Sequence, residues 1–420
     1  MKFSPKNSLF PWMPQLNPQV WILAFGRFLS EVGTGFTLFY APIFFVNHVG
    51  LSATAVGFAL GSASISGVVG RILGGAFSDS QYWGRRKTLL LSAAISAIAS
   101  LVLASANNFT VLVMGNLLVG FGQGLYWPAN ESVVADLTAP EQRHEAYAIT
   151  RLADNLGLGM GVVLGGALIS TTGAYRSLFI IDAVSFVVFF GVVYFAIKET
   201  YKPVDAKVAI SLKSSWQIAL SDRRLLIYVL VNIIFTTYIS QLQSTLPLYL
   251  KNFVALNASG AEFTEGTISI IFGWHLAIAI FTQLPVVRGL KRFTHPQSLI
   301  FSAVMWAMGF CLMWVTGVAT NYQLWWAIAA LSVFAIAIVS YTPSASALIT
   351  ELAPKSQLGV YFSISSLCWA VGYFIGPPLG GWALDQTPAF ADNFWLGLAA
   401  SVTVLVAILG YLDQMLKDRI

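Results

Sequence analysis

The chain has 420 residues, of which 57% are apolar and only 10% are charged. Soluble domains are about one quarter charged, so this composition argues against a water-soluble protein. The net charge of +5 does not indicate nucleic-acid binding, because almost all the cations lie in short loops between apolar runs. Cys311 and Cys368 lie inside apolar segments and indicate neither a disulfide framework nor a metal site.

At the amino terminus, residues 1–18 lack the apolar core and cleavage site of a signal peptide, so they are expected to remain a cytoplasmic tail. A membrane-spanning helix needs about 20 mostly apolar residues. Twelve segments of the chain meet this requirement. They lie near residues 19–46, 54–79, 86–106, 110–136, 144–171, 176–198, 224–252, 266–290, 297–317, 322–350, 356–384 and 393–415.

The polar stretch 199–223 divides the twelve segments into two groups of six, and its residues 214–221 could form a short helix on the membrane surface. The sequence therefore predicts an all-α membrane protein. Its parts would be a tail 1–18, a six-helix bundle 19–198, a cytoplasmic linker 199–223, a second six-helix bundle 224–415 and a tail 416–420.

The distribution of cations predicts the orientation in the membrane. If the amino terminus is cytoplasmic, 18 of the 23 Lys and Arg residues lie on that side. Only Arg176 and Lys251 then lie outside, and Arg27, Arg71 and Arg151 lie within spans. Cytoplasmic loops are enriched in Lys and Arg, so both termini are expected in the cytoplasm of a cell whose inner (plasma) membrane the chain crosses.

A glycine series occurs in the fifth segment and again, with the same spacing, in the eleventh. A repeated half is typical of secondary transporters, although small residues also serve general helix packing in membranes. The residues are Gly157, Gly161, Gly165 and Gly166 in the first copy and Gly372, Gly376, Gly380 and Gly381 in the second.

The loop between the second and third segments places Asp79 before Gly84, Arg85 and Arg86. This loop resembles the signature of the major facilitator superfamily, and the chain as a whole resembles its twelve-span drug:proton antiporter branch. The resemblance implies two pseudo-symmetric six-helix bundles that work by alternating access. The family usually has two residues between the aspartate and the glycine, whereas this chain has four.

Two further departures weaken the antiporter assignment but not the fold. The fourth segment has Asn116 where the family usually has an arginine. In the fifth segment Val162 follows Gly161, where antiporters typically have a proline, and the Gly-Pro pair occurs instead at Gly376 and Pro377.

The resemblance also assigns Asp136, at the end of the fourth segment, to a latch with Asp79, Gly84, Arg85 and Arg86. Charges of mixed sign at a helix junction can hold one conformation and release it when the helices separate. This latch is expected to favour the outward-facing state by tying the cytoplasmic ends together. The alternative is a group of solvated surface charges worth about 0–1 kcal/mol.

Four ionisable residues lie within spans one and five: Arg27 and Glu31, and Arg151 and Asp154. Each pair shares a helix face, and at about 1.5 Å per residue all four lie near the midplane. An ionisable residue at that depth costs several kcal/mol and is by default a hypothesis for a functional site. We expect one network in which Glu31, or secondarily Asp154, carries a proton and the arginines compete for it; the alternative is a static ion-pair cluster.

Other charged residues within spans are given lesser roles. His275 in span eight is expected to be a hydrogen-bonded packing residue or, less favoured, a proton relay. Asp182 and Arg71 are assigned to helix packing, and Glu131 to the region of Asp136.

In the resembled fold, spans one, four, seven and ten line the substrate cavity. Aromatic and neutral polar groups suit an amphipathic organic molecule or a sugar. Because the predicted cavity contains few cations, it has no evident site that would bind a phosphate or a dicarboxylate. The candidate cavity residues are Tyr126, Trp127, Asn130, Tyr238, Gln241, Gln243 and Tyr341.

The favoured function is a monomeric secondary transporter that exports a small amphipathic compound in exchange for protons. Alternatives are a sugar or metabolite carrier, or a sensor or lipid mover without ion coupling. No phosphate-cradling loop, metal-ligand spacing or nucleophile triad is present, so neither an enzyme nor a cofactor is expected. The partners would be the substrate, protons and the lipid bilayer.

Overall fold

The computed structural model of the chain describes residues 16–139, 142–201, 212–255, 262–354 and 358–417. Most of the predicted tails 1–18 and 416–420, and part of the predicted linker 199–223, lie outside these residues. The described part contains twelve helices long and apolar enough to cross a membrane. The predicted all-α membrane fold is therefore confirmed.

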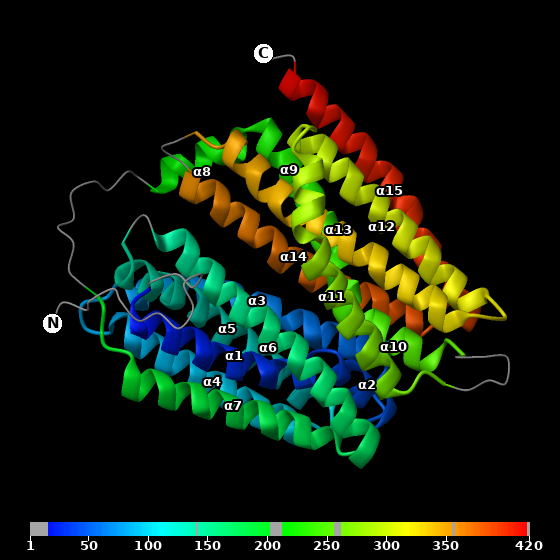
Figure 1. The fold of residues 1–420 in the computed structure, drawn as a ribbon, viewed down its shortest axis with the longest axis horizontal. Coiled ribbons are helices and arrows are strands. Elements are labelled where there is room, and N and C mark those ends of the chain that lie inside the picture. The colour runs from blue at the N-terminus through cyan, green and yellow to red at the C-terminus, as the bar shows by residue number, and fades with distance from the viewer. Residues whose placement is uncertain (1–15, 140–141, 202–211, 256–261, 355–357, 418–420) are drawn as a thin grey trace, which may run out of the picture.

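The helices of the amino-terminal half run from α1 to α7, and those of the carboxy-terminal half from α8 to α15 (Figure 1). The first half contains α1 (Pro18–Leu38), α2 (Tyr40–Asn47), α3 (Ala53–Ser78), α4 (Gly84–Ser105), α5 (Phe109–Leu137), α6 (Arg143–Thr172) and α7 (Tyr175–Ala196). The second half contains α8 (Leu212–Ser221), α9 (Arg223–Gln243), α10 (Thr245–Asn252), α11 (Glu265–Leu290), α12 (His295–Val318), α13 (Gln323–Leu352), α14 (Leu358–Leu384) and α15 (Pro388–Lys417).

Two predicted spans are each interrupted near one end. The segment predicted over 19–46 breaks at Phe39 into α1 and α2, and the segment predicted over 224–252 breaks at Ser244 into α9 and α10. Pro42 and Pro247 each follow a break by three residues. A proline has no N–H to donate to the carbonyl four residues earlier, which weakens the helix there. The short helix expected at 214–221 is present as α8.

Polar residues begin many of the helices. Their side-chain oxygens accept hydrogen bonds from the first free backbone N–H groups, which would otherwise lack partners near the membrane. Such N-caps are Asn17 for α1, Ser52 for α3, Asn108 for α5, Asp222 for α9, Thr264 for α11 and Thr294 for α12.

Each glycine series packs a helix against the first membrane-spanning helix of its own half. In α6, a Cβ on Gly161 would lie 2.9 Å from the Cα of Gly35 in α1. In α14, a Cβ on Gly372 would lie 2.6 Å from the Cβ of Thr236 in α9. The two copies therefore have the same role in the two halves, as expected for a repeated architecture.

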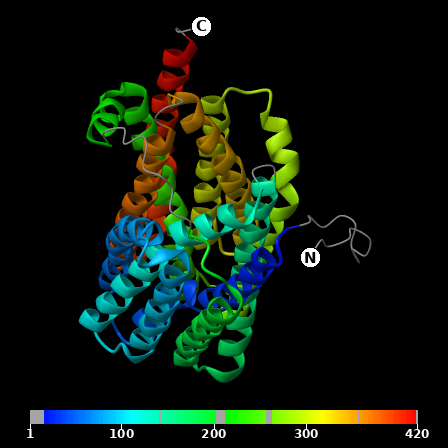
Figure 2. The same cartoon turned by 90° about the vertical axis from the view of Figure 1, so that its left-hand side faces the viewer.

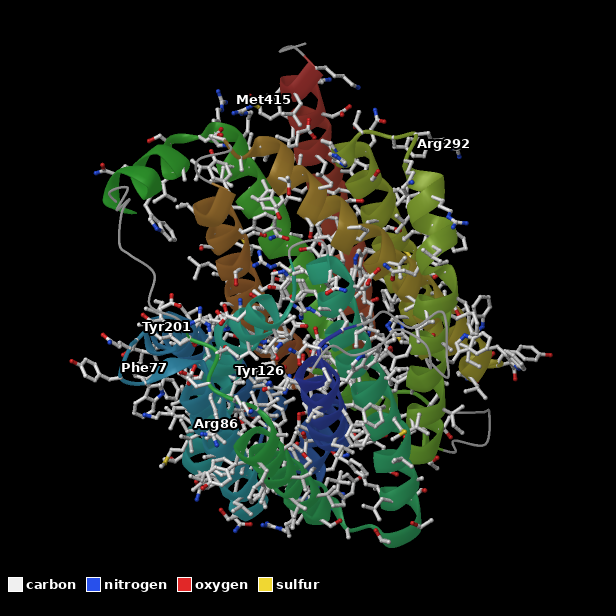
Figure 3. All side chains as sticks on the ribbon, turned by 60° about the vertical axis from the view of Figure 1, so that its left-hand side comes forward. Phe77, Arg86, Tyr126, Tyr201, Arg292 and Met415 are labelled. Atoms are coloured by element: carbon white, nitrogen blue, oxygen red, sulfur yellow. The ribbon has the colours of Figure 1, made fainter. Side chains whose placement is uncertain are left out.

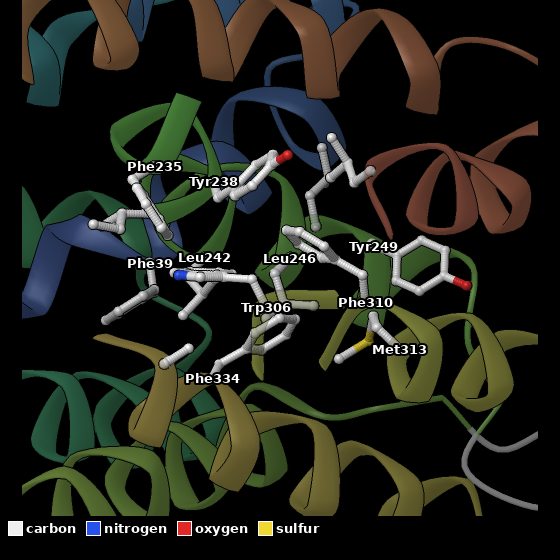
Figure 4. Close-up of a cluster of buried hydrophobic side chains, with 14 of the residues drawn as sticks. Phe39, Phe235, Tyr238, Leu242, Leu246, Tyr249, Trp306, Phe310, Met313 and Phe334 are labelled. Carbon is white, nitrogen blue, oxygen red and sulfur yellow. The ribbon is translucent and has the colours of Figure 1, made fainter. Parts of the chain in front are cut away.

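The core of the second half is a cluster of aromatic side chains from α9, α12 and α13 (Figure 4). The ring centroids of Trp306 and Phe334 lie 5.1 Å apart, and those of Tyr238 and Phe310 also lie 5.1 Å apart. These distances are typical of stabilising aromatic pairs. The cluster joins α9 to the outer helices of its half.

The two halves contact each other mainly through α3 with α14 and α6 with α11. We call the end of the molecule where α1 begins and α15 ends the tail side, and the opposite end the far side. Near the far side, Asn47 and Asn252 exchange two amide hydrogen bonds of 2.8 Å. Asp385 accepts hydrogen bonds from the backbone N–H groups of Ala53 and Thr54, at 2.9 and 2.8 Å.

Toward the tail side, the helices of the two halves diverge (Figures 1 and 2). The α3–α4 loop lies at this end of the first half, and α8 lies at this end of the second. We call this arrangement, in which the halves are hydrogen-bonded near the far side and their helices diverge toward the tail side, the tail-open state.

Candidate functional site

A buried ion cluster joins α1 to α6. The Arg27 Nε donates a hydrogen bond of 2.9 Å to the Asp154 Oδ1, and the Arg27 guanidinium also forms an ion pair with Glu31, one turn further along α1. The side chains of Arg27, Glu31 and Asp154 are only 7%, 11% and 14% exposed. Three of the four residues of the predicted network therefore share one site.

Aromatic rings complete the environment of Arg27. Its guanidinium carbon lies 4.0 Å from the centroid of Tyr126 and 5.8 Å from that of Trp127. A cation over an aromatic face is stabilised when water is excluded. The hydroxyl of Tyr126, inside the amino-terminal half (Figure 3), has no hydrogen-bond partner among the described residues.

Small residues bring the two helices close enough for this cluster to form. A Cβ on Gly157 would lie 2.9 Å from the Cβ of Glu31. Gly161 lies one turn further along α6, against Gly35. The contact between α1 and α6 is thus backbone against backbone, and it places Asp154 directly beside Arg27.

The charges in the cluster do not balance. One guanidinium faces two carboxylates, so the cluster carries a negative charge when all three groups are ionised. An uncompensated charge is costly in a medium without water. Binding of one proton to Glu31 or Asp154 makes the cluster neutral, which is the chemistry this arrangement can perform.

Asp182 lies next to the cluster. Its Oδ2 accepts a hydrogen bond of 2.6 Å from Ser100, and its Oδ1 has no described partner. The charges of Glu31 and Arg27 both act on it. Asp182 was predicted to support helix packing. A Cβ on Gly33 of α1 would lie 2.9 Å from the Asp182 Oδ1, which agrees with that role. The nearness of Asp182 to Glu31 was not foreseen.

Arg151 does not join the cluster, contrary to expectation. Its side chain is 57% exposed, forms an ion pair of 3.6 Å with Glu131 and lies 4.3 Å from the ring centroid of Trp127. Residues three apart on a helix differ by about 60° in direction. Asp154 therefore contacts α1, whereas Arg151 contacts residues of α5.

His275 is buried in α11, and its Nδ1 lies 2.8 Å from the Leu331 carbonyl oxygen in α13. This contact fits the packing role expected for it. No described hydrogen bond or ion pair connects His275 with Arg27, Glu31 or Asp154.

At the tail side, Arg85 lies between the two predicted carboxylates. Its Nε is 2.6 Å from Asp136 Oδ2, whereas Asp79 Oδ1 is 3.7 Å from the guanidinium, and the Asp79 side chain is 73% exposed. Arg86 instead donates to the Tyr194 carbonyl at 2.6 Å. The Arg85 pair is therefore made mainly with Asp136, and the four-residue spacer leaves Asp79 at the margin.

Glu199 holds this loop, although it was predicted only as the first residue of the linker 199–223. Its carboxylate accepts hydrogen bonds from the backbone N–H groups of Arg85 and Arg86, at 3.0 and 3.1 Å, at the start of α4. Gly84 precedes them with a φ of 78°, a conformation that favours glycine. A carboxylate is stabilised at the N-terminus of a helix. The acidic residue directly after span six was therefore the sequence signal that could have indicated this contact.

The latch residues Asp79, Arg85 and Asp136 all belong to the amino-terminal half. Their contacts are formed in a state whose halves diverge at this end (Figure 1). These ion pairs therefore do not tie the two halves together, and the predicted role in closing the tail side is wrong in that form. They hold α3, α4 and α5 in a fixed arrangement within one half.

The predicted cavity residues fall into two groups. Tyr126, Trp127 and Asn130 lie on α5, close to the ion cluster, and the Asn130 Oδ1 has no described partner. The others lie in the second half, where Gln243 is half-buried and the remaining three are buried.

Those three residues of the second half make packing contacts. Tyr238 hydrogen-bonds Ser401 at 2.6 Å within the aromatic core, so its predicted place in a cavity is wrong. Gln241 donates to the Gly376 carbonyl at 2.8 Å. Tyr341 donates to Asn232. Of the predicted cavity residues, only the group on α5 lies near the charged site.

Among the described residues, no group of three or more His, Cys, Asp or Glu side chains is placed to hold a metal ion.

Known proteins resemble this chain over most of its length. It is 24% identical over 388 residues to a Na(+), Li(+), K(+)/H(+) antiporter of Planococcus maritimus, a match that covers 85% of this chain and 88% of that protein. It is 24% identical over 385 residues to the multidrug resistance protein MdtH of Yersinia enterocolitica, covering 90% of this chain and 89% of that protein.

Solved structures share the fold. The nucleoside transporter NupG matches with a TM-score of 0.77 at 15% identity, covering 94% of this chain and 99% of that one. An auto-inhibited peptide transporter of the POT family matches with a TM-score of 0.75 at 15% identity, covering 95% and 97%. A family model described as Major Facilitator Superfamily matches residues 23–263 and 254–418. The chain belongs to the Major Facilitator Superfamily.

Proposed function

We propose that this protein exports a small amphipathic organic compound across the inner membrane in exchange for protons, by alternating access. The observation that carries the proposal is the buried cluster in which one arginine, Arg27, faces two carboxylates, Glu31 and Asp154. Such a cluster is neutral only with a bound proton, and a proton bound on one side of the membrane and released on the other couples transport to the gradient.

The proton step involves the residues that surround Arg27. When both carboxylates are ionised, Arg27 is held by both of them. When Glu31 binds a proton, Arg27 pairs with Asp154 alone, through the 2.9 Å hydrogen bond. The two protonation states thus differ in how tightly α1 is tied to α6. This difference biases the equilibrium between conformations.

The loop cations support cytoplasmic termini, so the tail-open state corresponds to the inward-facing one. A multidrug resistance protein among the relatives supports an amphipathic substrate. The aromatic side chains of Tyr126 and Trp127 beside the charged site suit the apolar part of such a molecule.

A second candidate function is exchange of a monovalent metal cation for protons. The negative charge of the Arg27 cluster would accept a cation in place of a proton, and one relative is named as a Na(+), Li(+), K(+)/H(+) antiporter. The test described next distinguishes the two, because the organic compound and the alkali cation are supplied separately.

The full chain is reconstituted in proteoliposomes, and an imposed proton gradient drives the movement of an organic dye or of Na⁺. Glu31→Gln removes the proton acceptor, so gradient-driven movement is expected to fall to background while substrate counterflow, which needs no proton, persists. Glu145→Gln, an exposed carboxylate in the first turn of α6, serves as the control and should transport like the wild type. Undiminished gradient-driven transport by Glu31→Gln would refute the proposal.

A further inference from the structure

Two arginines lie in membrane-spanning helices but outside the Arg27 cluster. Arg71 lies in α3 and Arg151 in α6, and both side chains are exposed in this tail-open state. A guanidinium at membrane depth costs several kcal/mol, and such residues usually line a water-filled path or a site. Neither arginine has a place in the proton step.

Arg71 and Arg151 both lie against α5: a Cβ on Gly124 would lie 2.8 Å from the backbone N of Arg71, and the guanidinium carbon of Arg151 lies 4.3 Å from the ring centroid of Trp127. Arg71 is influenced by the charges of both Arg151 and Glu131. It also donates a hydrogen bond to Ser366 of α14, which belongs to the opposite half. The two guanidiniums thus have neighbours in α5 and α14, which belong to opposite halves.

The negative charge at this place is insufficient. Arg151 pairs with the carboxylate of Glu131, which is 53% exposed and 3.6 Å away, and the charge of this same carboxylate acts on Arg71. A close arginine–carboxylate contact is about 2.7–2.9 Å long, so the pair is loose. The described hydrogen-bond partner of Arg71 is a neutral hydroxyl, that of Ser366.

We propose that Arg71 and Arg151 form an oxyanion-binding site, so that the transported compound is an amphipathic organic anion with a carboxylate, sulfonate or phosphate group. The planar guanidinium matches these groups in a bidentate manner. Trp127, which contacts Arg151 at 4.3 Å, lies where the apolar part of the compound would begin. This inference rests on the proposed transport function and specifies its substrate class.

Glu131 competes for the same site. Its carboxylate occupies Arg151 in the absence of substrate, and an arriving oxyanion would displace it. The substrate site therefore lies about one to two helical turns toward the tail side of the Arg27 cluster, since Arg151 precedes Asp154 in α6, and Glu131 follows Tyr126 in α5. No anion-binding group in the cavity was predicted from the sequence, because Arg71 was assigned to helix packing. The proposed site replaces that prediction.

The test is a binding measurement on the purified full chain with naphthoate, and with naphthamide as its neutral analogue. Naphthoate is expected to bind at least about tenfold more tightly than naphthamide, since a charge-assisted contact is worth roughly 1.5–3 kcal/mol. Arg71→Gln and Arg151→Gln should each remove that preference. Glu131→Gln should strengthen naphthoate binding several-fold, because it frees Arg151. Arg288→Gln, an exposed arginine at the end of α11, is the control.

Equal binding of the two probes, or unchanged naphthoate affinity in both arginine variants, would overturn the inference. Arg71→Lys and Arg151→Lys guard against misfolding, since each keeps the charge and should retain part of the preference. Naphthoate displaced by phosphatidylglycerol vesicles but not by phosphatidylcholine vesicles would support the oxyanion site and identify a lipid headgroup as its source. Binding needs no proton gradient. A negative binding result would therefore overturn the oxyanion site alone, and the Glu31→Gln experiment would still test the proposed proton coupling.

Discussion

At the scale of single residues, Arg27 decides whether the charged site can exist within the membrane. Its guanidinium touches Glu31, Asp154 and the face of Tyr126 at once. Each of these contacts depends on the arginine, whereas neither carboxylate has another described cation partner. Removal of Arg27 is therefore expected to destabilise the protein more than removal of either carboxylate.

Arg27→Gln should destabilise the protein by about 3–5 kcal/mol at neutral pH, because it leaves two buried carboxylates without a counter-charge. Lowering the pH should recover part of this stability, since protonated carboxyls are neutral. Chemical unfolding in detergent at two pH values measures both effects. Tyr126→Phe keeps the aromatic face and should be almost neutral. Wild-type stability of Arg27→Gln at neutral pH would show that the carboxylates are not both ionised.

Residue spacing predicted the ion cluster only in part. The four-residue spacing of Arg27 and Glu31 was sufficient to place them together, because both lie on one helix. The position of Arg151 was not predictable, because it depends on how α6 is rotated against α5. Spacing along one helix says which residues share a face, but not which neighbouring helix that face meets.

At the scale of helices, the glycine series of α6 and α14 set the distances on which the site depends. Without a side chain at Gly157 and Gly161, the backbones of α1 and α6 lie in direct contact. The spacing of the series was visible in the sequence, and it indicated a repeat. Which helix each series meets could not be read from it.

Gly161→Leu should separate α1 from α6 and so break the contact of Arg27 with Asp154. Gradient-driven transport is expected to be lost, and the unfolding temperature should fall by several degrees as packing is lost. Gly191→Leu in α7 is the control, because nothing lies within 4 Å of a Cβ at that position. If Gly161→Leu transports normally, close contact between α1 and α6 is not required.

At the scale of the whole molecule, contacts between the halves hold the far side closed. The two amide hydrogen bonds between Asn47 and Asn252, and the cap that Asp385 makes on α3, both cross from one half to the other. Alternating access requires these contacts to break when the far side opens. The ion pairs of Arg85 lie within one half, so they stiffen that half and do not join it to the other.

A cross-link between the halves should therefore stop transport. Cysteines replacing Asn47 and Asn252, in a background without Cys311 and Cys368, would be joined by a short reducible cross-linker, and transport should cease until the link is reduced. Cysteines replacing Asn107 and Arg176 are the matched control, because that hydrogen-bonded pair lies within one half. Continued transport with the Asn47–Asn252 link in place would contradict alternating access through this side.

The membrane class, the twelve spans, many helix starts and the repeat were predictable from the amino-acid sequence alone. These features depend on local composition, on polar N-caps and on spacing along one chain segment. Tertiary structure decided which charges share a site, that Tyr238 packs in the core, that Glu199 holds the α3–α4 loop, and which side of the molecule is open. Each of these depends on the rotation and contact of helices that are distant in sequence, and hydropathy does not encode that.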